Sequence, residues 1–118
     1  MPMNAVLKDA YQRELESARL AWNHKVLVSA FAHLERAHVL GQRYFLPHMQ
    51  VHLWMLRVGW ARRDWREVAG QLVRLLLTPL GHLTRRLPLC NTGGANVSAF
   101  QPMPIAPDLD ALLKLDEQ

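Results

Sequence analysis

Apolar residues recur at spacings of three and four in four consecutive segments of this chain, which is the period of one helix face. Turn residues separate these segments. The pattern predicts helices over residues 4–22, 25–40, 47–62 and 65–77. The first apolar stripe is the most regular and consists of Leu7, Tyr11, Leu15, Ala18 and Trp22. We therefore expect an all-α fold.

The residues between the segments indicate where each helix begins and ends. Gly41 is predicted to end the second helix in a left-handed conformation, and Pro47 to begin the third. Asp64 and Glu67 match a capping box, in which Asp64 accepts an N–H of the first turn and Glu67 reaches back. Pro79 and Gly81 are predicted to end the fourth helix. Its predicted apolar face consists of Val68, Leu72, Leu75 and Leu76.

The two helix pairs resemble each other. Leu34 and Arg36 in the first pair correspond to Leu72 and Arg74 in the second. Each pair has the pattern of a tetratricopeptide-like hairpin with a period somewhat above the usual length of about 34 residues. Two repeats rarely form a stable solenoid. We therefore predict a four-helix array of two antiparallel helical hairpins.

The C-terminal part of the chain has a different composition. Residues 87–107 are rich in Gly, Pro and small polar residues, yet they include apolar side chains. We expect this segment to wrap across the helical core as an extended tail. Asp108 is predicted to cap a short final helix over residues 109–115. The predicted organisation is one domain over residues 1–118, with the hairpins in 4–86, the tail in 87–107 and the short helix in 108–115.

Composition limits the classes of protein to which the chain can belong. Half of its 118 residues are hydrophobic and a fifth are charged, which is typical of a folded globular domain. The single cysteine excludes an intrachain disulfide and a Cys-rich zinc module. The first residues lack the pattern of a signal peptide, and no apolar run reaches the length of a membrane span. We expect a cytoplasmic protein that does not engage a membrane; composition does not predict its oligomeric state.

Histidines gather around the joint between the second and third predicted helices. His48 and His52 lie one helical turn apart and therefore share a face. His38, with Glu35 one turn before it, lies on the side of the preceding helix that should face them. Three imidazoles and a carboxylate suit Zn, Ni, Co or Cu. The alternative is that these histidines are structural and bond backbone carbonyls or Glu35; acid–base catalysis is a third possibility.

Two further candidates lie near the predicted tail. The loop from Asn91 to Asn96 contains two successive glycines, whose N–H groups are able to form an anion-binding nest. It lacks the lysine of a nucleotide-binding loop, and a turn that lets the tail cross the core is favoured. Cys90 with His82 as its base is a candidate nucleophile, but a small buried cysteine is favoured.

A basic and aromatic cluster surrounds the turn between the third and fourth predicted helices. Arginine and tryptophan together are able to grip phosphates and stack bases. We favour a solvated helix surface, with the tryptophans in the core and the arginines paired to Asp64 and Glu67, so nucleic acid is not the expected partner. The cluster consists of Arg57, Arg62, Arg63, Arg66, Trp54, Trp60 and Trp65.

Three stretches carry a resemblance to a known family. They read AFAHLERAHVLGQRY, PHMQVHLWMLRVGWARRD and NTGGANVSAFQPMPIAPDL, and together they span much of the chain. The sequence resembles a small bacterial family described only as domain of unknown function 3703. The resemblance implies an all-helical soluble protein and no established activity. His38, His48 and His52 lie within the matching stretches.

Two functional hypotheses follow from these patterns. In the first, the chain is a non-enzymatic helical binding protein that holds a transition metal through His38, His48 and His52, with Glu35 as a fourth ligand or as a partner that orients an imidazole. Such a site would suit metal homeostasis or handling. In the second, it is an interaction adaptor without metal that presents a groove or its tail to a protein partner. No complete set of nucleophile, base and oxyanion donors is recognisable, so an enzyme is not expected.

Overall fold

The computed structural model describes residues 3–84, 93–95 and 104–116, and within them the chain is helical without any strand. This confirms the predicted all-α class. Among the same residues, we find no helix that combines the length and the hydropathy of a membrane span. The helices are α1 (Ala5–Asn23), α2 (Leu27–Gly41), α3 (Phe45–Ala61), α4 (Trp65–Thr84) and α5 (Pro107–Asp116).

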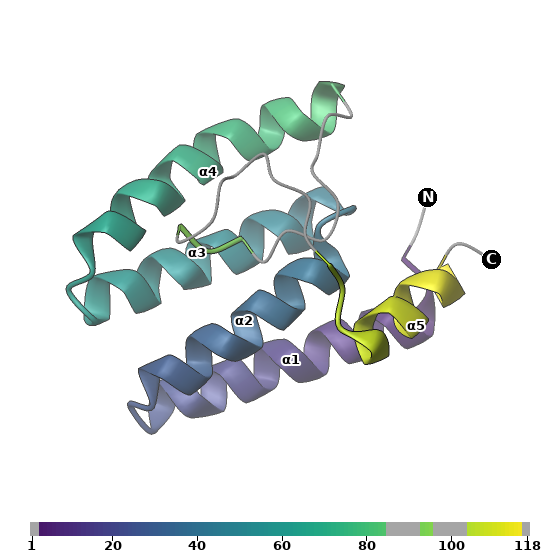
Figure 1. Cartoon of the computed structure of the whole chain (residues 1–118), viewed down its shortest axis with the longest axis horizontal. Helices are drawn as coiled ribbons and strands as arrows, with labels where there is room; N and C mark the ends of the chain where they lie inside the picture. The colour runs from purple at the N-terminus through teal and green to yellow at the C-terminus, as the bar shows by residue number, and fades with distance from the viewer. Residues whose placement is uncertain (1–2, 85–92, 96–103, 117–118) are drawn as a thin grey trace.

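Two helical hairpins, α1–α2 and α3–α4, lie side by side so that α2 packs against α3 (Figure 1). Their turns have the same backbone geometry. Lys25 has a φ of 60° and Arg63 a φ of 56°, and these residues are 38 positions apart (63 minus 25). In each turn the next residue's N–H donates to a carbonyl of the preceding helix at 2.9 Å. The internal similarity seen in the sequence therefore extends to the two turns.

The core lies between α1, α2 and α3, with α5 closing one end. Leu7, Tyr11, Leu15 and Ala18 of α1 are buried, as the periodicity predicts. Gly41 differs from the prediction, because it is the last residue of α2 and does not adopt a left-handed conformation. A Cβ at this position would lie 2.8 Å from Cε2 of Tyr11. Glycine is therefore needed here for close packing rather than for a turn.

Helix α4 corrects the sequence prediction in two ways. It continues through Pro79 to Thr84, and Pro79 lies on its exposed side. Its predicted apolar face is also largely wrong, since Leu72 is 50% and Leu76 is 79% exposed. The buried face is mostly polar instead. Besides Val68, its buried side chains are those of Glu67, Gln71, Arg74 and Thr78.

Helix α5 is fixed to the first hairpin by apolar and polar contacts. Leu109 and Leu113 are buried in the core. Asp108 lies in the first turn of α5, where it pairs with Arg36 of α2 instead of capping the helix from outside. Asp116 accepts a hydrogen bond from the backbone N–H of Asn4 at 2.7 Å. Most of the predicted tail, namely 87–92 and 96–103, lies outside the described residues.

Candidate metal centre

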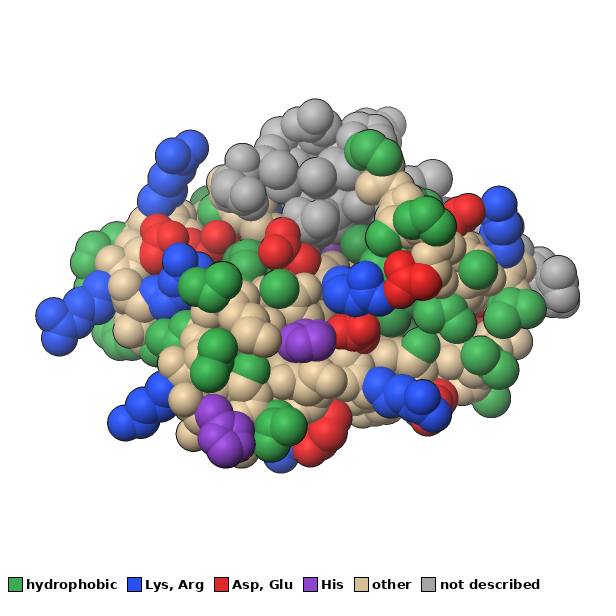
Figure 2. Space-filling view, turned by 60° about the horizontal axis from the view of Figure 1, so that its bottom comes forward, with side chains coloured by type: hydrophobic (Ala, Val, Ile, Leu, Met, Phe, Trp, Pro, Cys, Tyr) green, Lys and Arg blue, Asp and Glu red, His purple; other side chains and the backbone are tan. Residues whose placement is uncertain are grey.

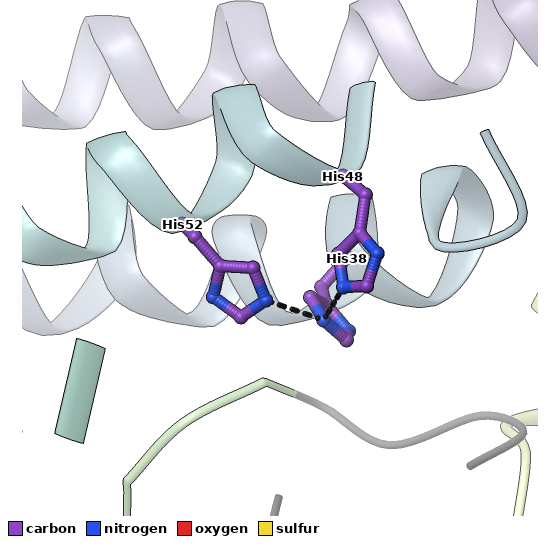
Figure 3. A group of neighbouring side chains, drawn as sticks. All are labelled: His38, His48 and His52. Atoms are coloured by element: carbon purple, nitrogen blue, oxygen red, sulfur yellow. Dashed lines mark hydrogen bonds between the residues drawn. The ribbon is translucent and has the colours of Figure 1, made fainter. Parts of the chain in front are cut away.

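The side chains of three histidines point toward one another between α2 and α3 (Figure 3). His48 and His52 come from successive turns of α3, and His38 comes from α2. The three residues are 3% (His38), 5% (His48) and 2% (His52) exposed. The structure thus confirms that these histidines lie close together, and the group that they form is buried in the protein interior.

The three rings meet through their Nε2 atoms. Nε2 of His38 lies 2.9 Å from Nε2 of His48 and 3.2 Å from Nε2 of His52. Nitrogen ligands about 2.0–2.1 Å from a tetrahedral zinc ion are roughly 3.3–3.4 Å apart, by simple trigonometry on those bonds. The two distances from His38 are slightly shorter than that, and the ligand atoms of all three histidines lie within 4.8 Å of one another. Side-chain rotations that open the short pairs and draw His48 and His52 together would place three ligands around one ion.

A buried glutamine of α4 fixes the tautomer of His52. The amide nitrogen of Gln71 donates to Oε2 of Glu67 at 2.7 Å and to the carbonyl of Gly93 at 2.8 Å. Both of these oxygens are acceptors, so the amide oxygen of Gln71 must face His52, whose Nδ1 lies 2.7 Å away. Nδ1 of His52 therefore carries the proton. In the neutral ring, Nε2 then presents a lone pair to the centre.

A fourth histidine supports the ring of His48. Nδ1 of His48 lies 2.9 Å from Nε2 of His82, which belongs to the last turns of α4. When Nδ1 of His48 donates to His82, Nε2 of His48 also presents a lone pair to the centre. The partially exposed ring of His82 thus connects the surface to the buried group. Sequence reasoning considered His82 only as a partner for Cys90.

Neutral rings cannot satisfy all three central nitrogens with hydrogen bonds. Nε2 of His52 presents a lone pair, and Nε2 of His38 carries at most one proton. If His38 donates, that one proton serves two neighbouring nitrogens, His52 and His48. If His38 carries no proton there, two lone pairs face each other at 3.2 Å. When Nδ1 of His48 donates to His82, one central lone pair in both cases lacks a proton of its own, and a cation at the centre would satisfy all three.

The environment keeps His48 and His52 neutral at physiological pH. Burial, together with the neighbouring His52 and His82, lowers the pKa of His48 to about 3. Burial also lowers the pKa of His52 to about 4; the Gln71 hydrogen bond opposes this effect, and the charge of Arg74 adds to it. Neutral imidazole is the form that binds metal ions, because a proton and a metal compete for the same lone pair.

The described segment Gly93–Ala95, here called the strap, lies across the histidine group and is held by one face of α4. Glu67 accepts the N–H of Ala95 at 2.9 Å, and Gln71 donates to the carbonyl of Gly93. Arg74 donates to the carbonyl of Gly94 at 3.0 Å. These bonds explain why α4 buries polar residues: each satisfies a backbone group of the strap. Gln71 joins the strap and His52 directly.

Glycine at position 93 allows the strap to lie this close. Gly93 has a φ of +86°, and a Cβ there would be 2.5 Å from Cδ2 of His38 and 2.9 Å from its Nε2. Any other residue would combine left-handed strain with a clash against the ring of His38. This part of the predicted Asn91–Asn96 loop therefore packs over the site, while 91, 92 and 96, like Cys90, lie outside the described residues.

The remaining predicted residues take different positions. Glu35 is half-buried on α2 and does not belong to the group of converging ligand atoms. Asp64 accepts the N–H of Glu67 at 3.1 Å, so half of the predicted capping box forms. The carboxylate of Glu67 turns to the strap instead of reaching back. His33 bonds Glu14 at 2.8 Å, away from the site.

The basic and aromatic cluster lies at the α3–α4 turn. Trp60 and Trp65 are exposed there and pack edge to face with their ring centroids 5.1 Å apart. The expectation that these tryptophans are in the core is therefore wrong for both. Arg57 lies over the ring of Trp54, 4.8 Å from its centroid. This geometry supports a solvated cluster of rings and guanidinium groups on the surface.

Comparison with known proteins places the chain in a family. The model of the family described as "Protein of unknown function (DUF3703)" matches residues 5–113. The chain belongs to this family. Searches of curated proteins and of solved structures find no match. The family match covers α1 to α4, most of α5 and all four histidines of the centre, and its description assigns no activity.

Proposed function

We propose that this protein binds one transition metal ion through the Nε2 atoms of His38, His48 and His52. The observation that carries the proposal is the convergence of three buried imidazoles, with Nε2 of His38 within 3.2 Å of Nε2 of both other rings. Nitrogen donors of this kind suit Zn, Ni, Co or Cu. We propose the three histidines alone as protein ligands, because Glu35 lies outside the group.

The outer contacts support this assignment. Metal-binding histidines commonly donate their second ring N–H to an acceptor that fixes the ring. His52 does so to Gln71, and His48 has His82 in the corresponding position. Three protein ligands leave one position in a tetrahedral set for an exchangeable ligand. We therefore propose a role in metal handling or homeostasis, by binding rather than by catalysis.

Thermal unfolding with added metal tests the proposal. An ion at 100 times its dissociation constant stabilises the folded state by about 2.7 kcal/mol, which raises the melting temperature of a domain this size by roughly 10 °C. We expect such a rise with at least one of Zn, Ni, Co and Cu, and none in the variant with both His48→Ala and His52→Ala. A wild type whose melting temperature none of the four metals raises would refute the proposal.

The alternative function, a protein-interaction adaptor without metal, is favoured by a separate observation. An apolar face of α4 is exposed, and it points away from the histidines. The two functions use different surfaces and are compatible in one molecule. Retention of a partner by the double histidine variant would show that the interaction does not depend on the metal centre.

A further inference from the structure

The outward side of α4 is apolar along most of the helix. Six side chains spaced around one face are 50–82% exposed. At about 1.5 Å of rise per residue, this stripe is roughly 27 Å long. The polar residues that an exposed face would normally carry are on the buried side, where they hold the strap. The stripe, here called the α4 stripe, consists of Trp65, Leu72, Val73, Leu76, Leu80 and Leu83.

Helix α4 is also at the edge of the fold. Its main helical neighbour is α3, and it lies along one side of the molecule (Figure 1). The opposite side, over α1, presents acidic and basic side chains interspersed with apolar ones (Figure 2). A continuous apolar face rarely remains exposed on a soluble monomer, because its burial is favourable at about 25 cal/mol per Å². The α4 stripe is therefore a surface built to be covered.

We propose that the α4 stripe is the interface of a homodimer, in which two copies pack α4 against α4 in antiparallel orientation about a two-fold axis near Leu76. Between residues 68 and 84 the only Lys, Arg, Asp or Glu is Arg74, which is buried against the strap. Two chains of net charge +4 thus meet through a face without exposed like charges. A two-fold interface requires a self-complementary face, which a uniform leucine stripe provides.

The area of the stripe suits a dimer. With the exposed fractions above, its six side chains expose on the order of 700 Å² in one copy, near the roughly 800 Å² that each partner contributes to a standard interface. Exposed Trp60 packs on Trp65 and extends the surface at one end.

A second copy fits the stripe better than a lipid surface does. Helices that lie on membranes carry Lys or Arg along their polar face to engage anionic headgroups. Within α4 the Lys and Arg residues are Arg66 in the first turn and the buried Arg74, while further arginines stand only before and after the helix in the sequence, at 62, 63, 85 and 86. Along its exposed face after the first turn, the helix therefore offers leucines without cations between them, which is the composition of a homodimer core.

Sedimentation velocity of the full chain tests the proposal. At about 50 μM, well above a micromolar dissociation constant, we expect twice the 13.6 kDa mass of one chain, with or without chelator. The variant with Leu76→Glu and Leu83→Glu should dimerise at least about 100-fold more weakly, because two charges per copy would be buried without partners. The matched control, Leu20→Glu with Val28→Glu, changes exposed residues of α1 and α2 and should remain dimeric.

A cross-linking measurement keeps the proposal testable if the glutamate variant fails to fold. In a Cys90→Ser background, Leu76→Cys should form an intermolecular disulfide under mild oxidation, and Val28→Cys should not. A monomeric wild type would overturn the proposal. A wild type that is monomeric and sediments with anionic phosphatidylserine vesicles in a Leu76-dependent way would assign the stripe to lipid instead. Equal cross-linking at both positions would also overturn it.

Discussion

Replacing Gln71 by Met removes the residue that connects the strap to His52 of the proposed metal centre, while keeping a side chain of similar length. Gln71 is completely buried. The change leaves three buried polar groups without this partner: Nδ1–H of His52, the carboxylate of Glu67 and the carbonyl of Gly93. The carboxylate keeps the N–H of Ala95, so the loss falls mainly on the other two.

The cost of the Gln71→Met change follows from these contacts. A buried polar group that loses its partner costs about 1–3 kcal/mol, so we expect roughly 3–5 kcal/mol of lost stability. At about 4 °C per kcal/mol for a domain this size, the melting temperature should fall by roughly 10–20 °C. Metal affinity should fall about 10- to 100-fold, because His52 loses the acceptor that orients its lone pair toward the centre.

Chemical denaturation and metal titration of the folded variant measure the two effects separately. Gln12→Met on the exposed side of α1 is the matched control and should leave both quantities within error of the wild type. A Gln71→Met protein with wild-type metal affinity would refute the orienting role of Gln71. A loss of stability below about 1 kcal/mol would refute the account of α4 as the helix that holds the strap.

Three further predictions concern the pH dependence of stability and two closely packed glycines. The folded-state pKa values of His48 and His52, about 3 and 4, are lower than the unfolded value of 6.5, so the unfolded chain takes up these protons first. The free energy of unfolding of the metal-free protein should therefore be highest above pH 6.5 and should fall by about 2–3 kcal/mol between pH 7.5 and 5.5, as measured by urea titration. A free energy of unfolding that does not change over this range would contradict the burial of both rings in their neutral form. Gly93→Ala should cost about 2–4 kcal/mol and weaken metal binding in the same titrations, because left-handed strain adds to the clash with the central ring. Gly41→Ala should cost about 1–3 kcal/mol by crowding Tyr11 even though alanine favours helices, and a gain in melting temperature would show that the contact relaxes freely.

The sequence predicts much of the helical framework, because apolar periodicity and turn residues are local signals. The face assignment of His38, His48 and His52 also succeeds, since each histidine shares its helix face with apolar residues. Their convergence then follows from antiparallel packing of α2 on α3. Periodicity is sufficient when the partner of a helix is another apolar face.

The same reasoning fails for α4, where leucine was taken as the mark of burial. The buried side of this helix is matched to backbone groups of the strap, whose position depends on a contact distant in sequence. Glu67, Gln71 and Arg74 recur at spacings of four and three, so polar periodicity was a usable signal. This polar periodicity can be interpreted only when the position of the strap is known. The role of His82 likewise depends on a contact 34 positions away along the chain.

The most direct test of the metal centre is the stoichiometry of metal on the purified chain. Equilibrium dialysis against Zn, followed by elemental analysis, should give one ion per chain for the wild type. The matched control, His24→Ala with His33→Ala, removes two histidines outside the centre and should also bind one ion. The variant with His48→Ala and His52→Ala should bind none, and the same comparison with Co adds a visible spectrum that reports tetrahedral nitrogen ligation. Equal binding by the site variant and the control, or no binding of any of Zn, Ni, Co and Cu by the wild type, would contradict the account.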